Sequence, residues 1–301
     1  MYNVALSTMW GIKRFARFGD FFVAGRAAGF ASFELNHGVN SAMLDSVSLN
    51  GYRITSVHEP CPADIPPAEL KQRDWLISAT DEENRRRGVE AVRRSIDLAQ
   101  QLGAAVVIVH PGRVVMDESL EAELHRLYRA GERHAPAYER VLAQMIAERS
   151  ARAPAHLAAV RRSLDELAAH AARRGVRLGL ENRDHYYEIP LIDEMEALLD
   201  AGYGDTVGYW HDIGHAQKAE YKGYGPHVAW LTRLADRTIG VHLHDIRGLD
   251  DHLVAGTGHM PWEMVARLLP AGILHTCEFQ NSSSPEQVAA GLRWLVENGL
   301  C

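Results

Sequence analysis

Six short apolar stretches of the sequence each end on a histidine or a carboxylate, the side chains that bind divalent metal ions and move protons. These residues are His58, His110, Glu181, Asp212, His242 and Glu278, and His215, Asp250 and His252 follow shortly after two of the stretches. Imidazole and carboxylate ligands without thiolate suit Zn²⁺, Mn²⁺, Co²⁺ or Fe²⁺. One polar residue at a strand end is more often a satisfied hydrogen-bonding group. The prediction of a metal site therefore depends on all six strand ends together.

The elements that must position these side chains are eight strands separated by helical patterns. The expected strands are Val4–Ser7, 32–35, Ile54–His58, Ala104–His110, Val176–Glu181, Val207–Asp212, Ile239–His244 and Ile273–Glu278. Continuous apolar strands between helices are typical of parallel strands buried on both faces. Eight such units predict an α/β fold, a (β/α)₈ TIM barrel, whose strand ends converge on one face. An open doubly wound sheet is the alternative, and the lack of a glycine-rich loop after the first strand counts against it.

Alternation along the strands predicts which side chains face the barrel interior. If Glu278 points inward, Cys277 points to the helices, and His242 and His244 both face inward by the same parity.

We expect a single domain over residues 1–301, with a helical insertion between strands four and five at about 113–156. Helical patterns continue to Arg174, where Arg173-Arg174-Gly175 is typical of a helix end. The first, more polar part of the insertion could be a lid, a homo-oligomer contact or a surface helix, and these alternatives stay open.

The composition indicates which kinds of binding partner and which cellular setting to expect. The chain has 301 residues and a formal net charge of −7, so it lacks the global field that attracts a polyanion, which argues against nucleic acid. Three cysteines without a CxxC pair indicate a reduced setting. The sequence shows no pattern of a signal peptide and no long uncharged apolar stretch, so we expect a cytoplasmic protein without a membrane partner.

The strand-end motifs resemble those of the xylose-isomerase-like TIM-barrel superfamily, which includes sugar isomerases, sugar epimerases and endonuclease IV. The matching motifs are Leu180-Glu181-Asn182, Asp212-Ile213-Gly214-His215, His242-Leu243-His244-Asp245, Asp250-Asp251-His252 with Gly256-Thr257-Gly258, and Cys277-Glu278. The resemblance implies a core ion, Zn²⁺ or Mn²⁺, on Glu181, Asp212, His242 and Glu278. The further ligands of endonuclease IV fall on His58, His110, His215, Asp250 and His252. The resemblance thus implies one to three ions.

Two functions follow, and the first is preferred. It is an isomerase or epimerase acting on a small sugar or sugar phosphate through a metal-stabilised enediolate, with Glu181 or Glu278 as the base. Its expected substrate contacts are Trp10, Arg183, Trp210, His244 and Arg247. Core packing for the tryptophans, and a salt bridge from Arg183 to Asp184 or Glu188, are equally good interpretations.

The alternative is a multinuclear zinc phosphoester hydrolase of the endonuclease IV type, acting on a small phosphoester. The number of matching ligands favours it. The acidic chain and the early loops, 10–13 and 36–39, which do not resemble DNA-gripping loops, count against a duplex substrate.

Overall fold

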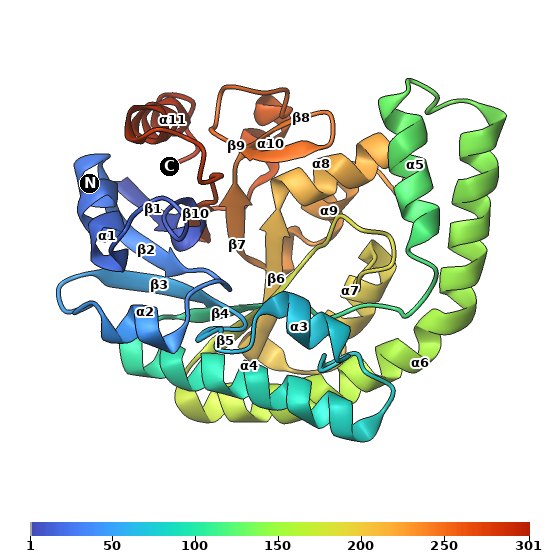
Figure 1. The fold of residues 1–301 in the computed structure, drawn as a ribbon, viewed down its shortest axis with the longest axis horizontal. Coiled ribbons are helices and arrows are strands. Elements are labelled where there is room, and N and C mark those ends of the chain that lie inside the picture. The colour runs from blue at the N-terminus through green and yellow to red at the C-terminus, as the bar shows by residue number, and fades with distance from the viewer. Residues whose placement is uncertain (1) are drawn as a thin grey trace.

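Eight parallel strands close into a barrel in the computed structural model, which describes residues 2–301 (Figure 1). The strands are β1 (Tyr2–Ser7), β2 (Phe30–Leu35), β3 (Arg53–His58), β4 (Val106–Val109), β5 (Arg177–Glu181), β6 (Val207–Asp212), β7 (Thr238–Leu243) and β10 (Leu274–Cys277). The order around the barrel is β1-β10-β7-β6-β5-β4-β3-β2. Closure between β1 and β10 confirms the predicted TIM barrel and excludes the open sheet.

Helices and short 3₁₀ turns connect the strands and cover the barrel. The helices are α1 (Phe18–Ala27), α2 (Ser41–Asp45), α3 (Pro67–Gln72), α4 (Glu82–Leu102), α5 (Ser119–Arg129), α6 (Pro136–Arg174), α7 (Ile192–Leu199), α8 (Ile213–Lys222), α9 (His227–Arg233), α10 (Trp262–Leu268) and α11 (Pro285–Glu297). The 3₁₀ turns are η1 (Thr8–Trp10), η2 (Gly204–Thr206) and η3 (Ala235–Arg237). Strand β4, Val-Val-Ile-Val, is buried along its whole length, as expected for a strand between the barrel interior and the helices.

The segment between β4 and β5 contains α5 and the 39-residue helix α6. The C-terminal part of α6 packs on the barrel beside α4, where Arg85 donates to Ser163 and Glu166. It ends at Gly175, whose φ of 65° is the left-handed conformation that glycine adopts without steric cost. The N-terminal part extends beyond the barrel and lies alongside α5 (Figure 1). A separate apolar cluster, which includes Leu124 and Tyr138, holds α5 and α6 together.

A two-stranded hairpin, β8 (Asp245–Arg247) and β9 (Asp250–Leu253), follows β7 at the C-terminal end of the barrel. The Asp245 carboxylate anchors the loop behind it by accepting the backbone N–H groups of Gly256 and Met260, both at 2.9 Å. The hairpin thereby brings His252 over the barrel end. Across residues 2–301, no helix has both the length and the apolar character needed to cross a membrane.

Candidate metal centre at the C-terminal end of the barrel

Four buried side chains from neighbouring strand ends meet at the centre of the barrel opening. Glu181 ends β5, Asp212 ends β6, His242 lies on β7, and Glu278 directly follows β10. Each offers a ligand atom within 4.8 Å of the others. His242 Nδ1 lies 2.8 Å from Glu181 Oε1, 3.3 Å from Glu278 Oε2 and 3.5 Å from Asp212 Oδ2. These are the four residues to which the resemblance assigned the core ion.

The hydrogen bonds of His242 indicate that the four side chains at the barrel opening suit a cation. A fourth carboxylate, Glu34 on β2, lies 3.2 Å from the other ring nitrogen, Nε2. A carboxylate accepts hydrogen bonds only, so His242 Nε2 carries a proton and donates it in a hydrogen bond to Glu34. In the metal-free protein Nδ1 also carries a proton, because the surrounding carboxylates, led by Glu278, raise the pKa of His242 well above its usual value, and Nδ1 lies 2.8 Å from Glu181 Oε1. A divalent ion held by Glu181, Asp212, His242 and Glu278 would replace that proton and balance the three carboxylates.

The carboxylates and imidazoles of the core shift one another's pKa values. Burial disfavours the charged form of Glu181, yet the positive charge and hydrogen bonds of neighbouring histidines, led by His110, hold its pKa well below the usual range. Burial likewise opposes a charge on His242, but Glu278 and Glu34 raise its pKa well above the usual value. The protein thus surrounds one imidazole with several ionised carboxylates, and such buried anions require a compensating cation.

Two further groups of candidate ligands flank the core. His58 and His110 meet Glu181 on one side, and His215 and His252 meet Asp212 on the other. Backbone carbonyls fix two of the ring tautomers: His58 Nδ1 donates to Glu59 at 3.2 Å, and His215 Nδ1 donates to Asn182 at 3.0 Å. In the neutral form of each ring, Nε2 then carries the lone pair, which is the form of histidine that binds a metal.

Carboxylates that the sequence analysis missed orient the ligand histidines. Glu34 accepts a hydrogen bond from His242 Nε2 and another from the Ser56 hydroxyl at 2.8 Å. Asp251 lies 3.1 Å from His252 Nδ1 and accepts from Lys218 at 2.8 Å. Such outer carboxylates set the tautomer of a metal-binding histidine and increase its basicity. The sequence contains one signal for Glu34, since it is a single charged residue inside the otherwise uncharged strand Phe-Ala-Ser-Phe-Glu-Leu.

The structure does not bring Asp250 and Arg247 to this cluster. Both are exposed on the β8–β9 hairpin, and Arg247 donates to the carbonyl of Thr257 at 2.7 Å. Asp250 belongs to none of the ligand groups, whereas its neighbour Asp251 supports His252. The side chains of adjacent strand residues point to opposite faces, so only one of two consecutive aspartates can face the centre.

Three other predicted substrate contacts are fully buried and already have structural roles. His244 Nε2 lies 3.1 Å from Asp212, and its Nδ1 accepts the backbone N–H of His252 at 2.9 Å. Trp10 donates to the carbonyl of Ser283 at 2.8 Å. Trp210 packs inside the barrel beneath the core, with its ring centroid 5.3 Å from that of His242. His244 and Trp210 therefore contact candidate ligands from behind, whereas Trp10 is part of the hydrophobic core.

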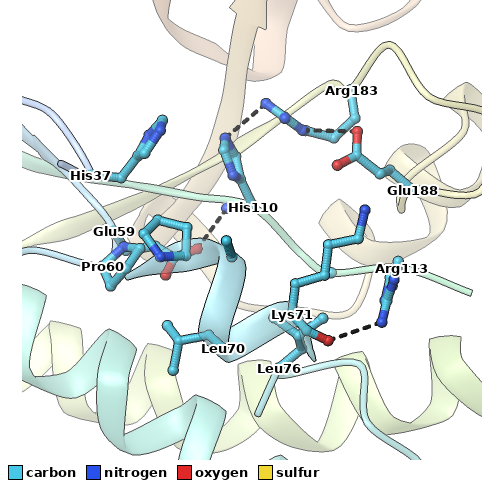
Figure 2. Close-up of a pocket in the computed structure, with 13 residues that line it drawn as sticks. His37, Glu59, Pro60, Leu70, Lys71, Leu76, His110, Arg113, Arg183 and Glu188 are labelled. Carbon is cyan, nitrogen blue, oxygen red and sulfur yellow. Dashed lines mark hydrogen bonds and ion pairs between the residues drawn. The ribbon is translucent and has the colours of Figure 1, made fainter. Parts of the chain in front are cut away.

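A cavity of about 250 Å³ opens beside the His58–His110–Glu181 group. Its lining includes His37, Glu59, Lys71, His110, Arg113, Arg183 and Glu188 (Figure 2). Arg183, the remaining predicted substrate contact, donates to Glu181 Oε2 at 2.9 Å and to Glu188 at 3.3 Å. The cavity thus lies next to the candidate ligands, so a small molecule bound in it would contact both Arg183 and the His58–His110–Glu181 group.

The cations in the lining are balanced by carboxylates. Arg183 pairs with Glu181 and Glu188, while Lys71 and Arg113 share Glu118. Burial raises the pKa of Glu59 to about 7. The cavity therefore offers many hydrogen-bonding groups but little net positive charge.

Comparisons with known proteins agree with this architecture. A family model described as "Xylose isomerase-like TIM barrel" matches residues 24–298. The uncharacterized protein y4fM of Sinorhizobium fredii is 26% identical over 208 residues, which cover 67% of this chain and 52% of that protein. This chain therefore spans about half the length of that relative.

Solved structures share the fold over nearly the whole chain. A D-tagatose 3-epimerase-like protein superposes with a TM-score of 0.68 at 19% identity, covering 99% of this chain and 97% of that one. The IOLI protein with a bound zinc atom superposes with a TM-score of 0.67 at 11% identity, covering 99% and 98%. The match of the family model over most of the sequence confirms the predicted resemblance, and this chain belongs to the xylose isomerase-like TIM-barrel family.

Proposed function

We propose that this chain is a divalent-metal-dependent isomerase or epimerase of a small sugar. The supporting observation is the convergence of Glu181, Asp212, His242 and Glu278, four buried candidate ligands of which three are carboxylates, directly beside a polar cavity. The names of the structural neighbours agree with it, since one is a D-tagatose 3-epimerase-like protein and another holds zinc.

The two glutamates are the proposed proton-transferring groups. In the barrel, β5 and β10 lie on either side of the pair β6 and β7, so Glu181 and Glu278 approach a bound substrate from opposite sides. A bound divalent ion polarises a substrate carbonyl and acidifies the neighbouring C–H bond. One glutamate removes that proton as a general base. Return of a proton to the opposite face of the same carbon inverts it, and return to the former carbonyl carbon moves the carbonyl.

The cavity supports an uncharged polyol rather than a phosphorylated substrate. Its cations are already paired with carboxylates. Its lining includes His37, whose Nδ1 is buried and has no hydrogen-bond partner among the described residues. Burial, together with the nearby His58, lowers the pKa of His37 to about 3, so the ring is neutral. A sugar hydroxyl both donates and accepts, and it would satisfy this nitrogen.

Exchange of substrate hydrogen with solvent tests the proposal. The metal-loaded protein is incubated in D₂O with a panel of free ketoses and aldoses, and NMR follows the carbon next to the carbonyl. We expect deuterium incorporation and a new stereoisomer or carbonyl isomer for at least one sugar. Complete absence of exchange across the panel, with metal bound, would contradict the proposal.

The second candidate is a multinuclear phosphoester hydrolase. The two flanking groups, His58–His110–Glu181 and Asp212–His215–His252, are the specific observation in its favour. A chromogenic phosphodiester serves as the counter-assay on the same protein. Hydrolysis that requires both flanking groups, without any sugar exchange, would favour this candidate.

A further inference from the structure

Three polar atoms meet at one edge of the candidate metal centre. Arg183 Nη1 lies 2.8 Å from His110 Nε2 (Figure 2). It also lies 2.9 Å from Glu181 Oε2, and His110 Nε2 and Glu181 Oε2 are 2.6 Å apart. Arg183 Nε is also held by Glu188 at 3.3 Å. The guanidinium therefore sits within hydrogen-bonding distance of two of the three candidate ligands of the His58–His110–Glu181 group.

The position beside His110 and Glu181 can hold either the Arg183 guanidinium or a metal ion. An imidazole nitrogen has one in-plane position, which holds either a proton or a metal ion. The Glu181 carboxylate is an acceptor only, so its 2.6 Å contact places a proton on His110 Nε2 in the metal-free protein. Arginine has donors only and stays charged at every pH that a folded protein experiences. An ion on His110 Nε2 and Glu181 Oε2 would have to replace that proton while lying beside the guanidinium, whose Nη1 is 2.8 Å and 2.9 Å from the same two atoms, so the charge of Arg183 opposes an ion there. The neighbouring Glu181 oxygen already shares the same guanidinium.

The chain has a second example of this arrangement, remote from the core ligands. Glu121, His125 and His185 form another group with metal-ligand spacing, on α5 and the loop after β5. There the ammonium group of the fully buried Lys222 lies 3.2 Å from Glu121. In both places a side-chain cation lies beside the carboxylate of a histidine–carboxylate group.

We propose that Arg183 is a built-in cation that takes the place of an ion at the His58–His110–Glu181 group. The protein then binds metal at the core and at the Asp212 side, but not on the Arg183 side. The local sequence explains why this residue reaches back: Arg183 comes two positions after Glu181, and Asn182 between them is tied by its amide to the backbone of Asp212. The inference rests on the proposed metal centre and deepens it, because it sets how many ions that centre holds.

Metal counting separates this inference from the proposed function. Apo-protein is loaded with excess Co²⁺, freed of unbound ion by gel filtration, and analysed for ions per chain and for visible Co²⁺ absorption. Arg183→Met removes the charge while keeping an unbranched side chain. We expect this variant to bind one ion more than the wild-type protein, with an added absorption band. Arg113→Met is the matched control, because Arg113 lines the same cavity without contacting His110; it should bind the wild-type number.

Replacement of His110 identifies the position of the added ion. His110→Ala should leave the wild-type count unchanged, and Arg183→Met with His110→Ala should return to the wild-type count. Equal counts for the wild-type protein and Arg183→Met would overturn the inference while leaving the core centre intact. Loss of an ion from the single variant His110→Ala would overturn it as well. Absence of metal from every protein would overturn both the proposed centre and this inference.

Discussion

Glu34 Oε1 lies 3.2 Å from His242 Nε2, on the opposite side of the ring from the carboxylates that His242 Nδ1 faces. Glu34 comes from β2 and His242 from β7, so residues 208 positions apart in the chain form one buried pair. The pair holds His242 Nε2 and thereby directs Nδ1 to the core carboxylates, where an ion would replace its proton.

The first prediction follows from this pair. Glu34→Gln keeps the shape of the side chain but removes its charge, so His242 becomes a weaker ligand. We expect metal affinity to fall by roughly 10- to 100-fold, the usual effect of losing such a partner. Competition with a chromophoric chelator measures it. Ser56→Ala, which removes only the hydroxyl that supports Glu34, should have a smaller effect; an unchanged affinity in Glu34→Gln would show that the pair does not tune the metal.

The second prediction concerns the two proposed bases. Glu181→Gln and Glu278→Gln each remove the charge needed to take a proton, so we expect the exchange rate in D₂O to fall by about 10²- to 10⁴-fold. Circular dichroism should show an intact fold, and elemental analysis reports whether metal remains. Turnover at the wild-type rate by either metal-loaded variant would rule out its glutamate as a base.

The third prediction compares two adjacent aspartates. Asp251 is paired with His252 and Lys218, whereas Asp250 is exposed. Asp251→Asn should lower the affinity of the ion on the Asp212 side, and Asp250→Asn should leave it unchanged. Metal titration of both variants under the same conditions gives the comparison. The reverse pattern would mean that Asp250 is the ligand, as the resemblance implied.

The fourth prediction is that metal removal destabilises the fold. Without an ion, Glu181, Asp212 and Glu278 remain buried around a single imidazole. An ion held at 100 times its Kd contributes about 2.7 kcal/mol to the free energy of unfolding. Differential scanning calorimetry with and without chelator should show a lower Tm in the apo-protein, restored by adding metal back. An identical Tm would show that the ion does not bind the folded chain in preference to the unfolded chain.

The fifth prediction is a pH dependence that comes from Glu121, outside the core. Burial alone would raise the pKa of Glu121, but the hydrogen bond from His185 and the charge of Lys222 lower it to about 2. A lowered folded-state pKa stabilises the protein above the unfolded-state value of about 4.5, and this contribution is lost as pH falls toward 2. At about 1.4 kcal/mol for each unit of pKa, the contribution is on the order of 3 kcal/mol.

Urea unfolding of the metal-free protein at pH 6 and pH 3 measures this loss without interference from acid release of metal. Glu121→Gln has no carboxylate to protonate, so its free energy of unfolding should fall less between the two pH values than that of the wild-type protein. Parallel losses in both proteins would show that Glu121 is not responsible.

The barrel and the convergence of its strand-end side chains were predictable from the sequence because both depend on local patterns. Eight apolar strands between helices lead to one closed parallel sheet, and parallel strands in such a sheet place their C-terminal ends on one face. Alternation within a strand then decides that Glu278 turns inward while Cys277 faces the helices. These two patterns bring the strand-end histidines and carboxylates to one face, the family resemblance implied Glu181, Asp212, His242 and Glu278 among them, and the structure does place these four together. Their roles as ligands and bases remain predictions.

The tertiary structure alone decided what surrounds that core. Arg183, Lys71 and Arg113 come from three different loops and helices, so their meeting at one cavity depends on distances across the barrel that no local pattern contains. The choice of Asp251 over Asp250 depends on the twist of the β8–β9 hairpin, where His252 adopts a positive φ of 55°. Sequence spacing can place a ligand at the end of a strand. Which charge lies opposite it, an ion or the guanidinium of Arg183, is set by packing between segments that are distant in the chain.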